Sequence, residues 1–212
     1  MHEASKALTR RLRDSRFVTR YFVGNGIDIG CGPDPVSQYA EQFPLMQQVK
    51  NWDMPDGDAQ YLASITDESV NFVHSSHCLE HMLDPEIAMQ NWLRVLKPGG
   101  HMIITIPDED LYEQGKFPST FNSDHKWTFT LHKQKSWSPK SINLLDFLAK
   151  FSDFAQILKL ELLDASYRYQ LGRFDQTLTP VAEAGIEFIL RKWTGSEIQQ
   201  AGRFPLLPQT GL

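Results

Sequence analysis

The sequence has little of what marks exported or membrane-spanning proteins. Its 212 residues include only two cysteines, Cys31 and Cys78, whose spacing fits neither a disulfide framework nor a zinc site. The longest apolar run, at 102–106, is far too short to cross a bilayer, and the amino terminus is charged where a signal peptide would be apolar. We therefore expect a cytoplasmic protein, with neither export nor membrane insertion.

Positive charge is also scarce. The chain has 21 Lys and Arg residues against 26 Asp and Glu residues, so its formal net charge is −5. Because a phosphate backbone requires a broad basic surface, this balance disfavours a nucleic-acid partner. The basic residues within 4–20 surround an apolar stripe of helical spacing, and we interpret them as the solvated face of a helix that covers a binding site. A basic arm for an anionic partner is the alternative.

Apolar runs of strand length alternate with helical patterns along the chain. An Asp84-Pro85 start followed by apolar residues at helical spacing predicts a helix that ends before Lys97, and further helices are expected over 36–43 and from Ser138 to Leu148. Buried strands are expected near 26–29, 46–52, 70–74, 102–106, 157–163 and 186–190. This alternation is typical of an α/β fold with a parallel sheet.

The apolar content suffices for one sizeable core. At 41% hydrophobic residues and 212 residues in all, without internal repeats, the sequence predicts a single domain. We divide it into an amino-terminal helix (1–22), a binding core (24–107), a lid or insertion (108–137), a segment that completes the sheet (138–192) and a loose tail (202–212).

The segment 26–33, GIDIGCGP, predicts a strand that ends in a glycine turn. Gly30 and Gly32 can adopt a positive φ and have no Cβ, so a ligand can approach the main chain there, with the Asp28 carboxylate beneath it. A dinucleotide site would need G-x-G-x-x-G, but the sixth position is Pro35, which has no amide donor. An ordinary strand-to-helix turn is the other alternative.

Further motifs follow the glycine turn in a characteristic order. They are Asp53 at a strand end, Asp58, the run Leu79-Glu80-His81 and the block RVLKPGG at 94–100. With the turn, this order over residues 24–107 resembles the type-11-like class I S-adenosylmethionine-dependent methyltransferases. The resemblance implies a Rossmann-like α/β fold whose mostly parallel sheet has an antiparallel last strand, and it implies S-adenosylmethionine as the cofactor.

By this resemblance the cofactor lies over the glycine turn and the two acids. Asp53 accepts hydrogen bonds from the ribose hydroxyls, Asp58 meets the adenine amino group, and Met54 lines the adenine face. The expected cofactor-binding residues are Asp28, Gly30, Cys31, Gly32, Asp53, Met54, Asp58, Ala59, Ser75 and His77. Because Asp53 and Asp58 are only five residues apart, either the helix and edge strand that the family places between them are missing, or one acid is a turn residue. We expect a shortened edge.

The histidines after the third strand can be interpreted as structural residues or as functional ones. By the resemblance, His81 belongs to a Glu-His pair, and we interpret it as a structural, hydrogen-bonded histidine. His77 and His81 have the spacing of helical metal ligands, but a metal could use them only if a third ligand converged. We therefore expect no metal.

Residues 108–137 lack a regular period and are rich in aromatic residues, which favours an ordered lid over a disordered loop. Methyl transfer from a sulfonium is an in-line displacement, and a hydroxyl acceptor also needs a base. We choose His125 as that base, with Asp124 as the neighbour that raises its basicity; a surface histidine is the alternative. The acids within 108–113 would form an acidic mouth for a polyhydroxylated or cationic substrate.

These features predict an enzyme that methylates a small molecule, most simply at a hydroxyl of a sugar or related metabolite. A nucleic-acid or protein methyltransferase that uses the basic amino-terminal segment is one alternative. A non-catalytic cofactor-binding module is another, since a fold does not determine a function. The acceptor atom and the oligomeric state are left open.

Overall fold

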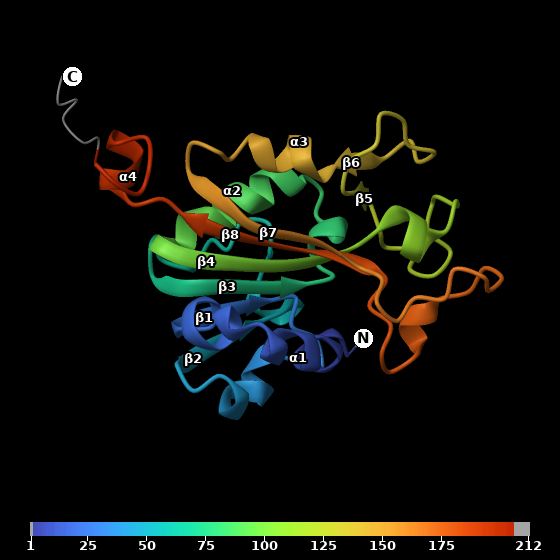
Figure 1. Cartoon of the computed structure of the whole chain (residues 1–212), viewed down its shortest axis with the longest axis horizontal. Coiled ribbons are helices and arrows are strands. Elements are labelled where there is room, and N and C mark those ends of the chain that lie inside the picture. Colours follow the sequence, from blue (N-terminus) through green and yellow to red (C-terminus); the bar gives the residue numbers. More distant parts are fainter. Residues whose placement is uncertain (1, 206–212) are drawn as a thin grey trace, which may run out of the picture.

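A six-stranded sheet forms the centre of the protein in the computed structural model, which describes residues 2–205 (Figure 1). The spatial order of its strands is β2 (Met46–Trp52), β1 (Gly24–Ile29), β3 (Val70–Ser76), β4 (Leu96–Pro107), β8 (Gly185–Lys192) and β7 (Ala155–Leu163). Strands β1 to β4 pair in parallel, and β8 runs antiparallel to both of its neighbours. The predicted α/β fold, with a mostly parallel sheet and an antiparallel last strand, is confirmed.

Both faces of the sheet are buried. Side chains alternate between the two faces along each central strand, so neighbouring residues pack into different cores. Phe72 of β3 packs into the core under the amino-terminal segment. Its neighbour Val73 packs into a larger core under helices α2 (Pro85–Val95) and α3 (Leu144–Ala149), which cover the other face (Figure 1). Burial on both faces explains why these strands are near-continuous apolar runs in the sequence.

Helix α2 begins where the sequence predicts, because its first turn is capped locally. The Asp84 carboxylate accepts hydrogen bonds from the amides of Glu86 and Ile87, at 2.9 and 3.1 Å. Pro85 occupies the first turn, where its missing amide costs nothing. The helix ends at Val95, before the Lys-Pro-Gly-Gly run, as expected.

The predicted start of the next helix is wrong. Helix α3 begins at Leu144 rather than Ser138, because residues Ser141–Asn143 form strand β6, which pairs in parallel with β5 (Thr128–Thr130). That pairing is a contact distant in sequence, which competes successfully with the local helical pattern. Residues Val36–Gln42 form a 3₁₀ helix in place of the helix expected there.

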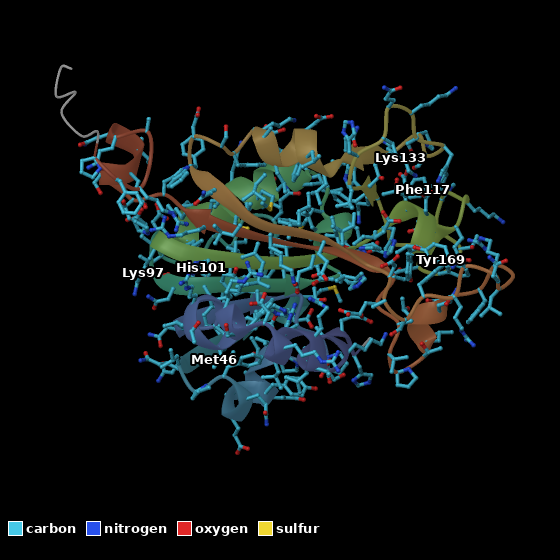
Figure 2. All side chains as sticks on the ribbon, in the orientation of Figure 1. Met46, Lys97, His101, Phe117, Lys133 and Tyr169 are labelled. Atoms are coloured by element: carbon cyan, nitrogen blue, oxygen red, sulfur yellow. The ribbon has the colours of Figure 1, made fainter. Side chains whose placement is uncertain are left out.

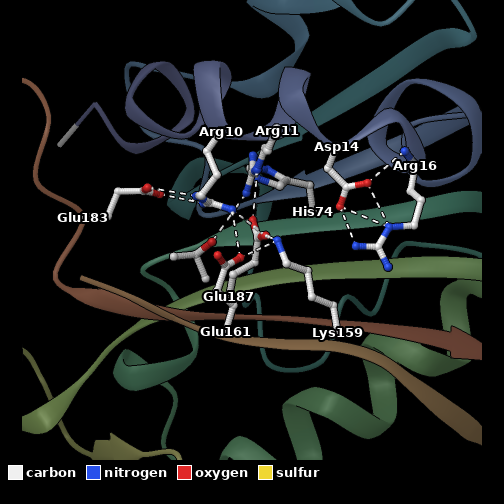
Figure 3. Close-up of polar contacts among 10 residues, drawn as sticks. Arg10, Arg11, Asp14, Arg16, His74, Lys159, Glu161, Glu183 and Glu187 are labelled. Atoms are coloured by element: carbon white, nitrogen blue, oxygen red, sulfur yellow. Dashed lines mark hydrogen bonds and ion pairs between the residues drawn. The ribbon is translucent and has the colours of Figure 1, made fainter. Parts of the chain in front are cut away.

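Helix α1 (Glu3–Arg13) packs across the sheet through ion pairs (Figure 3). Arg10 donates to the buried Glu187 carboxylate of β8 at 2.6 Å, and Arg11, only 2% exposed, donates to the same carboxylate at 3.1 Å. Lys159 of β7 completes the set at 2.9 Å from Glu187. These basic side chains therefore bind their own sheet, which disfavours the basic-arm alternative.

The connection after β2 is short, so β2 is an edge strand. All of residues 53–69 are described, and the only helix or strand among them is the 3₁₀ turn Met54–Asp56. The helix and edge strand that the resemblance would place here are absent from these residues. The predicted shortened edge is confirmed. It opens the sheet edge beside the end of β1.

The remaining helices are short. They are π-helical segments at Phe17–Tyr21 and Glu109–Glu113, 3₁₀ turns at Leu79–His81 and Gln176–Leu178, and α4 (Gly195–Gln199). None of the helices within residues 2–205 combines the length and apolar character needed to cross a membrane. The expected loose tail lies largely outside the described residues, which end at Pro205.

Long connections gather at the end of the molecule where β4 gives way to the 108–137 segment. Figure 2 shows Phe117, Lys133 and Tyr169 at this end, and Lys97 and His101 at the opposite end. Ligands bind in open α/β sheets at the carboxyl ends of the parallel strands. The loops of this end are therefore placed to surround a ligand.

Candidate active site

The glycine turn after β1 provides both a tight contact and open space. Gly30 and Gly32 adopt positive φ angles of 69° and 53°. A Cβ on Gly30 would lie 2.7 Å from the Cβ of Cys78, so glycine there permits the loop after β3 to pack closely. A Cβ on Gly32 would meet nothing within 4 Å, so glycine there keeps the space above the turn free.

The amides of this turn already have partners. Gly30 and Cys31 both donate to the Trp52 carbonyl, at 2.8 and 3.3 Å, and the amide of Gly32 donates to the Asp53 carboxylate at 3.1 Å. A pyrophosphate site needs free backbone donors at such a turn. The geometry therefore agrees with the sequence argument against a dinucleotide fold.

Two cavities meet at the turn and share Gly30, Gly32 and His77 in their walls. The smaller, of about 150 Å³, lies under helix α1 and is also lined by Glu3, Ala4, Asp28, Cys31, Pro33, Asp34, His74 and Ser76. The larger, of about 610 Å³, is also lined by Asp53, Met54, Gly57, Asp58, Ala59, Cys78, His81, Met82 and Asp124. The structure thus brings together the predicted cofactor-binding residues, with one exception.

The exception is Ser75. It is fully buried, and its hydroxyl donates to the carbonyl of Ile29 at 2.9 Å, between β3 and β1. Because side chains alternate along a strand, the next residue, Ser76, lines the smaller cavity instead. Ser76 is absent from the residues predicted from the sequence, although the alternation of side chains along β3 would identify it.

Asp28 braces the loop that follows the turn. Its carboxylate is 1% exposed, accepts from the Val36 amide at 2.7 Å and lies 2.6 Å from Nδ1 of His74. Both oxygens therefore already have a partner within the protein. Asp28 lies beside the smaller cavity, as the sequence suggests, and fixes the shape of its wall.

Asp53 caps a turn and faces the larger cavity. Its carboxylate accepts from the amides of Met54 and Gly32, while Asp56 accepts from the Asp53 amide at 2.9 Å in a capping box. A carboxylate has about four lone-pair sites, so two remain for a ligand. Asp58, by contrast, accepts from the amide of Gln60 at 2.8 Å, as a turn residue does.

A buried cluster of ionisable side chains adjoins the larger cavity. The Glu80 side chain is fully buried, and its Oε1 lies 3.5 Å from Nδ1 of His77 and 3.8 Å from Nε2 of both His81 and His125. Burial alone would raise the pKa of Glu80, but the three histidines outweigh it and hold that pKa below its usual range. His77 has a raised pKa, because Glu80 and Glu3 outweigh the burial that opposes its charge.

His125, the predicted base, is the buried member of this cluster. Its side chain is fully covered, and its Nδ1 lies 2.6 Å from Oε1 of Glu113. The expected partnership with Asp124 is wrong: that carboxylate lies 2.9 Å from Nδ1 of His81, because His125 points inward while Asp124 remains at the surface. Of His81 and His125, His81 is therefore the one that lines the larger cavity.

The acids within 108–113 do not form an acidic mouth. Glu109 is fully buried and binds neighbouring groups of the protein, Lys133 at 2.7 Å and Ser141 of β6 at 2.6 Å among them. Asp108 caps the next helical turn, and burial raises its pKa to about 6. This expectation is wrong because the segment uses its acids to hold itself in shape.

A third cavity, of about 570 Å³, lies between the amino terminus, the 108–137 segment and residues 175–180. Tyr112 and Phe121 contribute aromatic surface to its wall, and His2, Ser5, Lys6, Asn122, Asp175, Thr177, Leu178, Thr179 and Pro180 complete the lining. The amino terminus and the 108–137 segment therefore share a hollow of ligand size.

Solved structures of known proteins share this fold. The plantazolicin methyltransferase BpumL, in complex with SAH, is 13% identical over 91% of this chain and 85% of its own, with a TM-score of 0.58. A SAM-dependent methyltransferase from Archaeoglobus fulgidus is 17% identical over 89% and 94%, with a TM-score of 0.55. A chain from the complex of a methyltransferase with the Trm112 methyltransferase activator of Haloferax volcanii is 12% identical over 91% and 90%, with a TM-score of 0.58.

The family itself is established from the sequence. A family model described as a methyltransferase domain matches residues 3–148, which is about two thirds of the chain. No match was found among curated proteins. The two joined cavities fit the cofactor of this family, because open space lies over Gly32 and the larger volume falls within the roughly 300–1,000 Å³ of small-ligand sites. The chain therefore belongs to the methyltransferase domain family, as a class I enzyme that uses S-adenosylmethionine.

Proposed function

We propose that this enzyme methylates a hydroxyl of a small polyhydroxylated molecule, such as a sugar. The observation that carries the proposal is the lining of the larger cavity. Asp53 and Met54 lie in its wall together with the His81–Asp124 pair, so one hollow contains both the expected cofactor residues and groups able to bind a hydroxyl. When bound, S-adenosylmethionine supplies an electrophilic methyl group on its sulfonium.

The cofactor would span both cavities. In this proposal Asp53 accepts hydrogen bonds from the ribose hydroxyls, and Met54, which is 90% exposed, covers the adenine. Asp58 and Ala59 lie beside Met54 in the larger cavity, while Cys31 and Ser76 line the smaller one, where the methionine end would lie. Gly32 lets the ligand pass over the main chain between the two.

A small acceptor fits the surroundings better than a macromolecule. Arg10 and Arg11 of α1 are paired with Glu187, and Lys6 is paired with Glu3 at 2.8 Å. The helix that would have to bind a phosphate backbone is therefore largely neutralised. The third cavity instead offers two aromatic side chains, the Asn122 amide and several hydroxyls, with one residue of each charge, Lys6 and Asp175, which suits a small ligand with many hydroxyls.

A hydroxyl acceptor must lose its proton as the new C–O bond forms and the C–S bond breaks. The Glu80 cluster adjoins the cavity, and His81, with 20% of its side chain exposed, is the member that a substrate can reach directly. In this proposal the cluster activates the acceptor. The role of His125 as the base stays a prediction; its side chain has no exposed surface, and its ring centroid lies 4.9 Å from that of His81.

Transfer of a deuterated methyl group tests this proposal. The enzyme is incubated with methyl-deuterated S-adenosylmethionine and, separately, with a panel of sugars and sugar nucleotides, with RNA and with protein extract. Mass spectrometry should find a deuterated O-methyl group on a member of the sugar panel. Transfer only to RNA or protein would contradict the proposal and favour the macromolecular alternative. Cofactor binding with no transfer to any acceptor would favour a non-catalytic binding module.

A further inference from the structure

Buried polar atoms without partners gather around Glu80. Among the described residues, buried side-chain atoms that make no hydrogen bond include both carboxylate oxygens of Glu80, both ring nitrogens of His77, Nε2 of His125 and Oε2 of Glu113. A buried polar atom that stays unpaired destabilises the folded protein. They lie close together, so one bound ligand would complete several of them at once.

The spacing of these atoms suits a metal ion. One ligand atom each from Glu80, His81 and His125 lies within 4.8 Å of the other two. The Oε1 of Glu80 is 3.8 Å from Nε2 of each histidine. In a tetrahedral site with bonds of about 2.1 Å, neighbouring ligand atoms lie roughly 3.4 Å apart. The two distances to Glu80 therefore exceed that spacing by about 0.4 Å, and the three atoms can close around one ion by a small movement of their side chains.

The opposite nitrogen of each histidine is already held by a carboxylate. Asp124 lies 2.9 Å from Nδ1 of His81, and Glu113 lies 2.6 Å from Nδ1 of His125. Metal-bound histidines commonly have such a carboxylate partner, which fixes the tautomer that directs Nε2 to the ion. Both rings therefore present Nε2 toward Glu80 in the form that a metal requires.

The cluster also joins two parts of the chain. Glu80 and His81 lie in the 3₁₀ turn after β3, and His125 comes from the 108–137 segment. The backbone carbonyl of Glu80 accepts from the amides of Lys126 and Trp127, at 2.9 and 3.3 Å, so the two parts are already tied together beside the cluster. The set differs from the His77 and His81 pair considered from the sequence, because Glu80 takes the place of His77 and His125 joins from more than 40 residues away.

From this arrangement we infer that Glu80, His81 and His125 bind one divalent transition-metal ion. Two imidazoles and one carboxylate suit ions such as Zn²⁺, Co²⁺, Fe²⁺ and Mn²⁺. Because His81 lines the larger cavity, the ion has an open side toward it, where it would bind a hydroxyl and lower that hydroxyl's pKa. That role rests on the proposed function; the binding of the ion does not.

Titration of the chelator-treated protein with a metal salt tests the site. Zn²⁺, Co²⁺ and Mn²⁺ are each added in a calorimeter, without S-adenosylmethionine or any acceptor. We expect at least one of these ions to bind with a stoichiometry of one per chain. Because no methylation is measured, failure of this site and failure of the proposed function are separate outcomes.

Variants locate the ion. Glu80→Gln and His81→Gln should each weaken binding at least about 100-fold, and Asp124→Asn about 10-fold, the size of effect seen for groups that orient a ligand. His132→Gln, at an exposed histidine, is the matched control and should bind as the wild type does. His81 is partly exposed, so its variant should fold even if the Glu80 variant does not.

Thermal unfolding gives an independent measurement. The ion should raise the unfolding temperature of the wild type and of His132→Gln, and should leave that of His81→Gln unchanged, since only a folded site binds it. Absence of binding by all three ions, or equal affinity in the wild type and His81→Gln, would overturn the inference. The cluster would then be a hydrogen-bonded support for the 108–137 segment.

Discussion

At the scale of single residues, Asp53 shows how one carboxylate can serve the fold and a ligand together. It closes the capping box of the Met54–Asp56 turn and also accepts from Gly32, so it connects the glycine turn to the end of β2. Its position in the wall of the larger cavity leaves lone pairs for a bound ribose. Asp56 shares the capping box but does not line either cavity, so the two roles can be separated by mutation.

Asp53→Ala should weaken S-adenosylmethionine binding roughly ten- to a hundredfold, because hydrogen bonds to a carboxylate contribute about 1.5–3 kcal/mol. Calorimetry measures the change. Asp56→Ala is the control: it loses the capping box, at a cost of about 1 kcal/mol of stability, and should keep its cofactor affinity. Unchanged affinity in Asp53→Ala, or an equal loss in both variants, would make Asp53 a cap only.

His125→Ala should lower turnover by about two to four orders of magnitude and leave cofactor affinity nearly intact. The reason is its place in the Glu80 cluster, where Glu113 holds its ring. Turnover and affinity are measured separately, with His132→Ala as the control. A loss of turnover below about tenfold in a folded His125→Ala protein would remove His125 from the reaction.

At the scale of elements, helix α1 forms a cover for the smaller cavity, and one carboxylate holds it there. Glu3 and Ala4 line that cavity, while Arg10 and Arg11 reach Glu187 of β8. Glu187 is fully buried, and Arg11, Arg10 and Lys159 outweigh that burial and lower its pKa to about 2. The position of α1 therefore depends on the Glu187 carboxylate, which stays charged down to low pH.

Glu187→Gln should destabilise the protein by about 3–5 kcal/mol, because it leaves the buried Arg11 without its charged partner. The folded pKa of Glu187 is depressed, so its contribution is present above about pH 4.5 and disappears as the pH falls through about 2. Urea unfolding at several pH values between 2 and 7 should show this dependence in the wild type and much less of it in the variant.

The same measurements on Glu183→Gln provide the comparison, since Glu183 pairs with Arg10 closer to solvent. We expect the free energy of unfolding of this variant to fall by about 1 kcal/mol or less, because partly exposed ion pairs contribute little to stability. Equal stability losses in the two variants would show that Glu187 has no special part in holding α1.

Elements set by local chemistry could be predicted from the sequence, and those set by distant contacts could not. The Asp84 cap and Pro85 identify the start of α2 within a few residues of sequence. The start of α3 depends on the pairing of β6 with β5, and the ring partner of His125 is Glu113, twelve residues earlier in a segment without a period. Neither contact leaves a pattern in the residues around it.

At the scale of the whole molecule, the loops and the amino-terminal helix meet at one end of the sheet (Figure 1). The cavities around Gly32 and the hollow beside Tyr112 both lie among these elements. We propose that residues 108–137 act as a lid there. Most basic residues of α1 form ion pairs within the protein, so this helix offers little positive charge to an anionic partner.

The protein should therefore bind RNA weakly. The net charge is −5, and Arg10 and Arg11 are paired internally, so α1 has few cations free to replace the counterions of a phosphate backbone. Fluorescence anisotropy with a labelled RNA at about 50 and 200 mM salt measures this. Tight binding that weakens a thousandfold or more over that range would instead support the macromolecular alternative.

A crystal structure with S-adenosylhomocysteine tests the central claim most directly, because it shows whether the two cavities form one cofactor site. We expect the adenine beside Met54, the ribose hydroxyls within hydrogen-bond distance of Asp53, and the homocysteine end in the cavity under α1. The sulfur should then face His81 across the larger cavity. A ligand bound elsewhere, or a ribose without contact to Asp53, would contradict this account of the site.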